Sequence, residues 1–191
     1  MNNSSKLNLR FAVLVAIILL AAFSRIIPRM PDFSPLGAIG LFGAAYFQKK
    51  WHAFLIPIAA TWLSDLFINN VIYAKYYMNF TWFYSGFYWI YGTYLLIVLA
   101  GIFILKKVTV KRVVAASIVS TAIFYLVTNF ICWPGNAMYS QNFEGLMSCY
   151  AAGIPFLTGT FLGDLFYSSV LFGGFELAKR QWPALKVGFN Y

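Results

Sequence analysis

Two aspartates, Asp65 and Asp164, lie within long apolar segments and have nearly the same local sequence. The first stands in Thr-Trp-Leu-Ser-Asp-Leu-Phe at 61–67 and the second in Thr-Phe-Leu-Gly-Asp-Leu-Phe at 160–166, and the other three acidic residues lie outside apolar runs. An ionisable side chain inside a membrane helix costs roughly 2.5–3.5 kcal/mol on insertion scales, so it normally faces a cavity or a partner. Each aspartate could simply bind a neighbouring helix, but the repetition favours a functional role.

The composition of the chain indicates the setting of these aspartates. Of 191 residues, 61% are hydrophobic and 10% are charged, and the mean hydropathy of +0.73 is far above that of soluble domains. A membrane-spanning helix needs about 20 mainly apolar residues. The sequence therefore predicts an all-α integral membrane protein with one transmembrane domain over residues 1–191 and six transmembrane helices, at about 11–23, 35–47, 51–71, 85–105, 113–132 and 151–175.

The basic residues predict how this domain is oriented. The net charge of +9 and pI near 9.6 are typical of nucleic-acid binders, but eleven of the fourteen basic residues fall in segments on one side of the predicted membrane domain. Arg25, Arg29 and Lys75 are the three on the other side. Because Lys and Arg concentrate in cytoplasmic loops, we expect cytoplasmic N- and C-termini in a bacterial inner membrane and no nucleic-acid partner.

This orientation gives the repeated aspartate segments a possible meaning. The third predicted helix runs outward and the sixth runs inward, so the two segments would lie in halves of opposite direction. Such a 3+3 inverted repeat is used by many secondary transporters around a central site. The match covers seven residues, and a chance resemblance between two apolar helices is the alternative.

Residues 73–94 are the most aromatic part of the chain, with twelve aromatic residues in twenty-two. Tyr and Trp concentrate at membrane interfaces, but aromatic walls with a few polar groups also bind small, partly apolar ligands. Two arginines on the same side could pair with a ligand carboxylate or with Asp32. The candidate ligand-binding residues are therefore Arg25, Arg29, Asp65, Trp82, Tyr84, Trp89, Asn129, Trp133 and Asp164.

Small residues indicate where helices approach closely. Gly37, Gly40 and Gly43 make a face on which another helix can pack, and ordinary close packing is their main interpretation. Together with Ala12 and Ala16 they are the candidate contacts with a partner helix. A separate pair, Cys132 and Cys149, brackets the loop expected at 133–150 and is compatible with a disulfide or with free thiols.

Several segments together resemble a family of bacterial six-helix membrane proteins without an assigned function. The likeness covers most of the chain and rests on Arg25-Ile26-Ile27-Pro28, Pro31-Asp32-Phe33-Ser34-Pro35-Leu36-Gly37-Ala38, Leu41-Phe42-Gly43-Ala44-Ala45-Tyr46-Phe47, Leu63-Ser64-Asp65, Thr128-Asn129-Phe130, Gly145-Leu146, Cys149-Tyr150, Ile154-Pro155-Phe156 and Gly163-Asp164-Leu165.

More loosely, the chain is similar to the substrate-binding S-components of energy-coupling-factor (ECF) vitamin transporters. The similarity lies in its size, its six predicted spans, its cytoplasmic termini and its Gly-rich second span. It implies capture of a vitamin-like molecule from outside, with a transmembrane coupling protein and ATPase subunits as partners. The Ala-xxx-Ala pattern of their coupling face is matched by Ala12-Val13-Leu14-Val15-Ala16, whereas vitamin-specific motifs are not recognisable.

The sequence therefore predicts a membrane transport protein that binds a small molecule, as an ECF-type substrate-binding subunit. There is no Walker-type Gly-rich loop and no His or Cys cluster at metal-ligand spacing, so we expect no metal, no cofactor and no enzymatic activity. The alternatives are a proton-coupled secondary transporter using Asp65 and Asp164, a structural membrane protein, and an intramembrane aspartyl hydrolase. The hydrolase would require Gly-x-Gly-Asp, but Phe161 stands where its first glycine should be.

Overall fold

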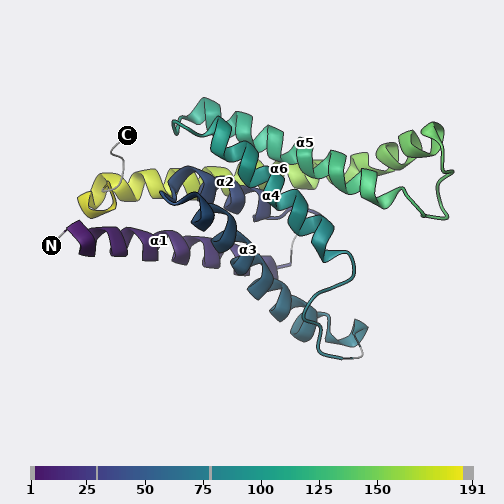
Figure 1. Ribbon diagram of the computed structural model, residues 1–191, viewed down its shortest axis with the longest axis horizontal. Coiled ribbons are helices and arrows are strands. Elements are labelled where there is room, and N and C mark those ends of the chain that lie inside the picture. Colours follow the sequence, from purple (N-terminus) through teal and green to yellow (C-terminus); the bar gives the residue numbers. More distant parts are fainter. Residues whose placement is uncertain (1–2, 29, 78, 187–191) are drawn as a thin grey trace.

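The computed structural model describes residues 3–28, 30–77 and 79–186. Within these ranges the protein is all-helical, as predicted, with no strands and six α-helices (Figure 1). The helices are α1 (Asn3–Phe23), α2 (Leu36–Tyr46), α3 (Lys50–Phe67), α4 (Phe87–Ile104), α5 (Val110–Cys132) and α6 (Phe143–Gln181). A single π-helical turn, Ile68–Ile72, continues α3.

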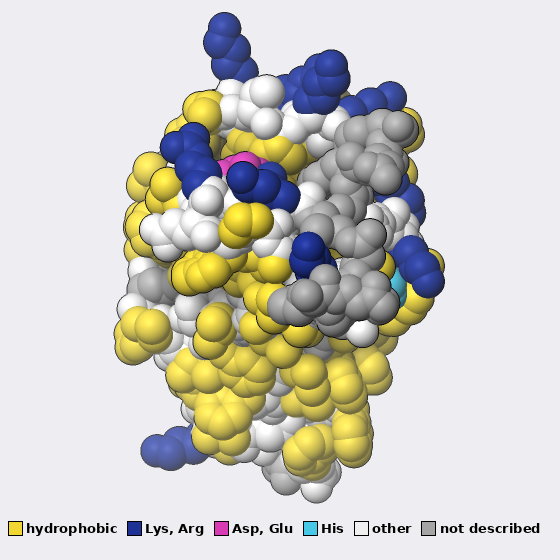
Figure 2. Space-filling view, turned by 90° about the vertical axis from the view of Figure 1, so that its left-hand side faces the viewer, with side chains coloured by type: hydrophobic (Ala, Val, Ile, Leu, Met, Phe, Trp, Pro, Cys, Tyr) yellow, Lys and Arg dark blue, Asp and Glu magenta, His cyan; other side chains and the backbone are white. Residues whose placement is uncertain are grey.

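Five of these helices are long and apolar enough to cross a membrane, which indicates a membrane protein. Both chain ends lie at the same end of the molecule (Figure 1). Figure 2 faces that end, where Lys and Arg side chains gather around the upper part while the lower part is mainly hydrophobic.

Helix α2 is the exception in length and lies at the centre of the bundle. Its eleven residues rise only about 16 Å, roughly half the thickness of a hydrocarbon core. It contacts each of the other five helices, and all its residues except Ala45 are buried. A helix that is apolar on every side is stable only when enclosed in this way. The segment expected at 35–47 is therefore a short central helix rather than a full span.

Two helices are longer than the expected spans. Helix α1 begins at Asn3, not near 11, because no helix-breaking residue interrupts its polar start. A tertiary contact also holds this part of the helix, since the Arg10 guanidinium donates to the Tyr46 carbonyl, 3.1 Å away. Helix α6 begins at Phe143, not near 151, because the Asn142 side chain caps it by accepting from the Gly145 amide at 2.9 Å. The loop before α6 is correspondingly shorter than expected.

The glycines of α2 allow close packing inside this chain. A Cβ on Gly37 would overlap Asp164 of α6, one on Gly40 would lie 3.2 Å from Val98 of α4, and one on Gly43 would lie 2.8 Å from Pro57 of α3. This corrects the assignment of Gly37, Gly40 and Gly43 to a partner-helix surface, because α3, α4 and α6 occupy that space.

Candidate functional site

Two adjoining chambers lie between the helices and form the candidate site. The first chamber has a volume of about 210 Å³ and the second about 400 Å³, and Asp32, Phe124 and Thr160 line both. The first is bordered mainly by α2, α4, α5, α6 and the segment before α2, whereas the second lies mainly between α5 and α6. In Figure 1 the α3–α4 and α5–α6 pairs diverge on the side opposite the chain ends.

The segment before α2 reaches the site because α6 lacks side chains where the two meet. A Cβ on Gly159 would overlap the Pro31 carbonyl oxygen, and one on Gly163 would lie 2.7 Å from the Ser34 amide nitrogen. The Phe33 ring packs on Phe166 and Tyr167, with centroids 5.6 and 5.5 Å apart. Glycine at position 163 of the repeated motif thus admits a neighbouring backbone beside Asp164.

Asp32, on this segment, stands at the junction of the two chambers. Its φ of 57° lies in the left-handed region, which Asp tolerates better than most residues. Partial burial raises the pKa of the Asp32 carboxyl. Pairing with Asp32 is one of the two options that the sequence leaves open for Arg25 and Arg29. In the structure Asp32 is part of the wall of both chambers, and Arg25 pairs with Asp65.

Arg25 and Asp65 form an ion pair at one side of the first chamber. The Arg25 guanidinium donates to Asp65 Oδ1 and, at 2.8 Å, to Ser64 Oγ. The Tyr91 hydroxyl donates to Asp65 Oδ2 at 2.7 Å. Arg25 was expected to bind a ligand carboxylate or Asp32, so its partner, on α3, was not foreseen.

Tyr84 lies near this ion pair. The structure therefore brings together three of the predicted ligand-binding residues, Arg25, Asp65 and Tyr84. Burial raises the pKa of the Tyr84 phenol, and the negative charge of Asp65 raises it further. The phenol is therefore neutral at physiological pH and remains a hydrogen-bond donor.

Asp164 occupies the other side of the first chamber. It is 2% exposed, and its Oδ2 accepts a hydrogen bond from Thr121 Oγ1 at 2.9 Å. The N-terminal turn of α2 lies beside it at Gly37, where the partial positive charge of a helix end favours a carboxylate. Ser120 Oγ, on the chamber wall, is buried and has no hydrogen-bond partner among the described residues.

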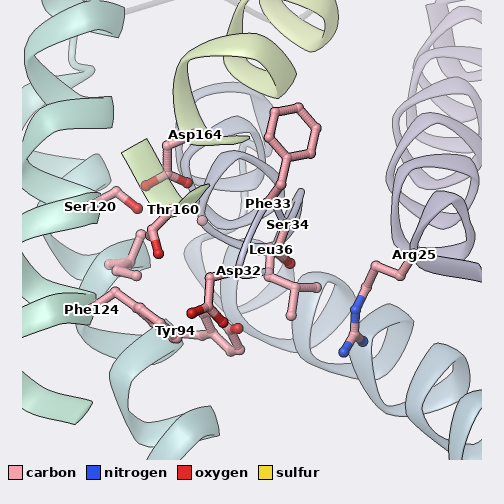
Figure 3. Close-up of a pocket in the computed structure, with 12 residues that line it drawn as sticks. Arg25, Asp32, Phe33, Ser34, Leu36, Tyr94, Ser120, Phe124, Thr160 and Asp164 are labelled. Atoms are coloured by element: carbon pink, nitrogen blue, oxygen red, sulfur yellow. The ribbon is translucent and has the colours of Figure 1, made fainter. Parts of the chain in front are cut away.

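Figure 3 shows the arrangement of these groups. Asp164, Ser120 and Thr160 lie together on one side of the first chamber, Asp32 is central, and Arg25 stands apart on the opposite side.

The second chamber contains Asn129 and both cysteines. Asn129 faces Gly153, where a Cβ on the glycine would overlap its side chain, and its Nδ2 donates to the Tyr125 carbonyl at 2.8 Å. Cys132 and Cys149 are free thiols. Asn129 therefore both holds α5 against α6 and lines the cavity.

The three candidate tryptophans line neither chamber. Trp82 and Trp89 are 59% and 50% exposed. Trp133 donates from Nε1 to the Ser140 carbonyl at 2.9 Å and so closes the loop before α6. These three predicted ligand contacts are corrected, because none of the three residues borders either chamber. Arg29 lies outside the described residues.

The comparison with known families bears on what this site does. A family profile described as a family of unknown function, DUF6580, matches residues 5–185. The chain belongs to this family. No curated protein and no solved structure matches the chain. The family therefore assigns no activity, and the chemistry of the site must carry the functional argument.

Sequence reasoning missed much of the wall contributed by α5. Polar and aromatic residues recur along one face of this helix at spacings of three and four: Ser117, Ser120, Thr121, Phe124 and Thr128. A polar stripe on an apolar membrane helix indicates a face turned to other protein groups or to a cavity, so this pattern could have identified the wall. Among the described residues, no group of three or more His, Cys, Asp or Glu side chains could hold a metal ion.

Proposed function

We propose that this protein is the small-molecule-binding subunit of a membrane transporter in the bacterial cytoplasmic membrane. The observation that carries the proposal is the pair of adjoining chambers of about 210 and 400 Å³, of which the larger falls by itself in the range of small-molecule sites. Charged and hydroxyl groups line the first chamber, and largely apolar and aromatic groups line the second. The ligand enters from the outer side, opposite the basic end that carries both termini.

An ECF-type partnership is the preferred form of this proposal. The chain has no nucleotide-binding motif, so ATP-driven uptake would use a transmembrane coupling protein and ATPase subunits. Ala12 and Ala16 are exposed on α1, next to Leu20, and leave a face of small residues for a partner helix.

A proton-coupled secondary transporter is the second candidate, favoured by the burial of Asp164. Asp65 is already neutralised by Arg25, so Asp164 would be the proton carrier. The 3+3 inverted repeat expected for this mechanism stays a prediction. A hydrolase with a shared carboxylate pair is disfavoured because Asp65 and Asp164 are bound by different groups, Arg25 and Tyr91 in one case and Thr121 in the other.

Native mass spectrometry of the protein purified from its own host in mild detergent tests the proposal. We expect a co-purifying small molecule together with coupling and ATPase subunits. A small molecule without partner subunits would support the secondary transporter. Neither a small molecule nor partners in repeated preparations would contradict small-molecule transport and favour a structural role.

Phe124→Ala should weaken retention of the co-purifying molecule, because the Phe124 ring lines both chambers. Loss of this aromatic contact should raise the apparent Kd about tenfold. Trp89→Ala is the matched control, since Trp89 is exposed and lies outside both chambers, and it should retain the molecule as the wild type does. Greater loss in the Trp89 variant would instead make residues 73–94 the binding surface.

A further inference from the structure

We infer that the ligand carries a positive charge, which is held in the first chamber between the carboxylates of Asp32 and Asp164. This inference rests on the proposed function and specifies its substrate class: an organic amine, a quaternary ammonium compound or a heteroaromatic cation.

The balance of charge around the chambers carries the inference. Three charged side chains line them among the described residues: Arg25, Asp32 and Asp164. The positive charge of Arg25 is balanced by Asp65, whose carboxylate accepts a hydrogen bond from the guanidinium. Two carboxylates are left facing the space, so a ligand carboxylate would meet two like charges, whereas a cation would meet two opposite ones.

Of the two aspartates, Asp164 gives the stronger argument for a bound cation, because burying its negative charge costs free energy. The carboxylate is 2% exposed, Thr121 donates a hydrogen bond to it, and the Ser120 hydroxyl lies close beside it. The N-terminus of α2 beside it supplies only about half a positive charge. A buried carboxyl group stays ionised when it is paired with a full opposite charge and otherwise takes up a proton. A bound cation would supply that charge and hold Asp164 in its ionised form.

The hydroxyl groups of the first chamber add acceptors that a bound cation could use. Ser120 is 1% exposed and lines the first chamber close beside Asp164, and among the residues described its Oγ makes no hydrogen bond of ordinary length. The Ser120 O–H can turn toward the Asp164 carboxylate, which leaves the lone pairs of Oγ free to accept a hydrogen bond from a ligand. The N–H groups of an ammonium or amidinium ion can donate to this oxygen and to Thr160, which lies near it in Figure 3.

Aromatic rings complete a site of this kind. Tyr94 and Phe124 line the first chamber and are stacked, with ring centroids 6.0 Å apart and ring planes inclined by 18°. Aromatic faces attract cations through their quadrupole, most strongly where water is excluded. The charged group therefore belongs in the first chamber, and an apolar remainder belongs in the second chamber, beyond Phe124.

Three probes of similar shape and different charge test the inference. Phenethylamine, 3-phenylpropanoate and 2-phenylethanol would be titrated at constant ionic strength into the full chain in lipid nanodiscs, and the shift in unfolding temperature measured. We expect phenethylamine alone to stabilise the protein. Asp32→Asn should weaken this binding about tenfold, the size expected for one charge-assisted contact.

Asp164→Asn should have the same effect, and Asp32→Asn keeps the test valid if the more deeply buried variant does not fold. Glu144→Gln is the matched control, because Glu144 is an exposed acid on α6 outside both chambers, and it should bind phenethylamine unchanged. 2-Phenylethanol controls for partitioning into the lipid.

Three results would overturn the inference. Equal or greater stabilisation by the anion or the alcohol would do so while leaving small-molecule transport standing. Stabilisation by none of the probes would also reject it, and native mass spectrometry would then show separately whether the protein retains any small molecule. Binding of phenethylamine that persists in both aspartate variants would place the cation elsewhere.

Discussion

Gly159→Ala is expected to lower the free energy of unfolding by about 2 kcal/mol or more, the usual cost of forcing extra atoms into a packed interior. The new Cβ would overlap the carbonyl oxygen of Pro31, which belongs to the backbone and cannot rotate away. The segment before α2 would have to move off α6 and take Asp32 with it, so ligand retention should fall as well. Thermal unfolding in nanodiscs and native mass spectrometry measure the two effects.

Gly173→Ala, on the same helix, is the control. Nothing lies within 4 Å of a Cβ at this position, and alanine is the better helix former by about 1 kcal/mol, so this variant should be as stable as the wild type or more stable. Equal stability of the two variants would show that α6 and the segment before α2 do not meet as described.

Arg25→Met should lower the free energy of unfolding by about 3–5 kcal/mol, the range for breaking a buried ion pair by removing one partner. Asp65 would remain in the protein interior with Tyr91 as its remaining donor, and hydrogen bonding by a phenol does not neutralise a carboxylate. Thermal unfolding of the purified variant in nanodiscs measures this effect.

The double variant Arg25→Met/Asp65→Leu separates the ion pair from a general loss of packing. Because it removes both charges together, it should recover most of the stability lost in the single variant. A double variant as unstable as the sum of the two single variants would show that Arg25 and Asp65 act independently.

The sequence by itself determined the class of protein and the main helical segments. Its apolar composition leaves an all-helical membrane protein as the outcome, because every backbone polar group in a bilayer must be satisfied internally. The apolar surroundings of Asp65 and Asp164 also identified them as buried carboxylates, since the cost of burying a charge depends on local sequence. Even the start of α6 was encoded locally, by Asn142 as its cap.

Only the tertiary structure decided which groups meet. Arg25 and Asp65 are 40 positions apart, and Asp32 and Asp164 line the same chamber because Gly159 and Gly163 leave room for the backbone of the segment before α2. The same packing left Trp82 and Trp89 exposed outside the chambers and placed Ser120 and Phe124 on the wall of the first chamber. Residue type and spacing indicate which side chains avoid lipid, but the partner of each one depends on how the helices cross, and those crossings are set by contacts between distant parts of the chain.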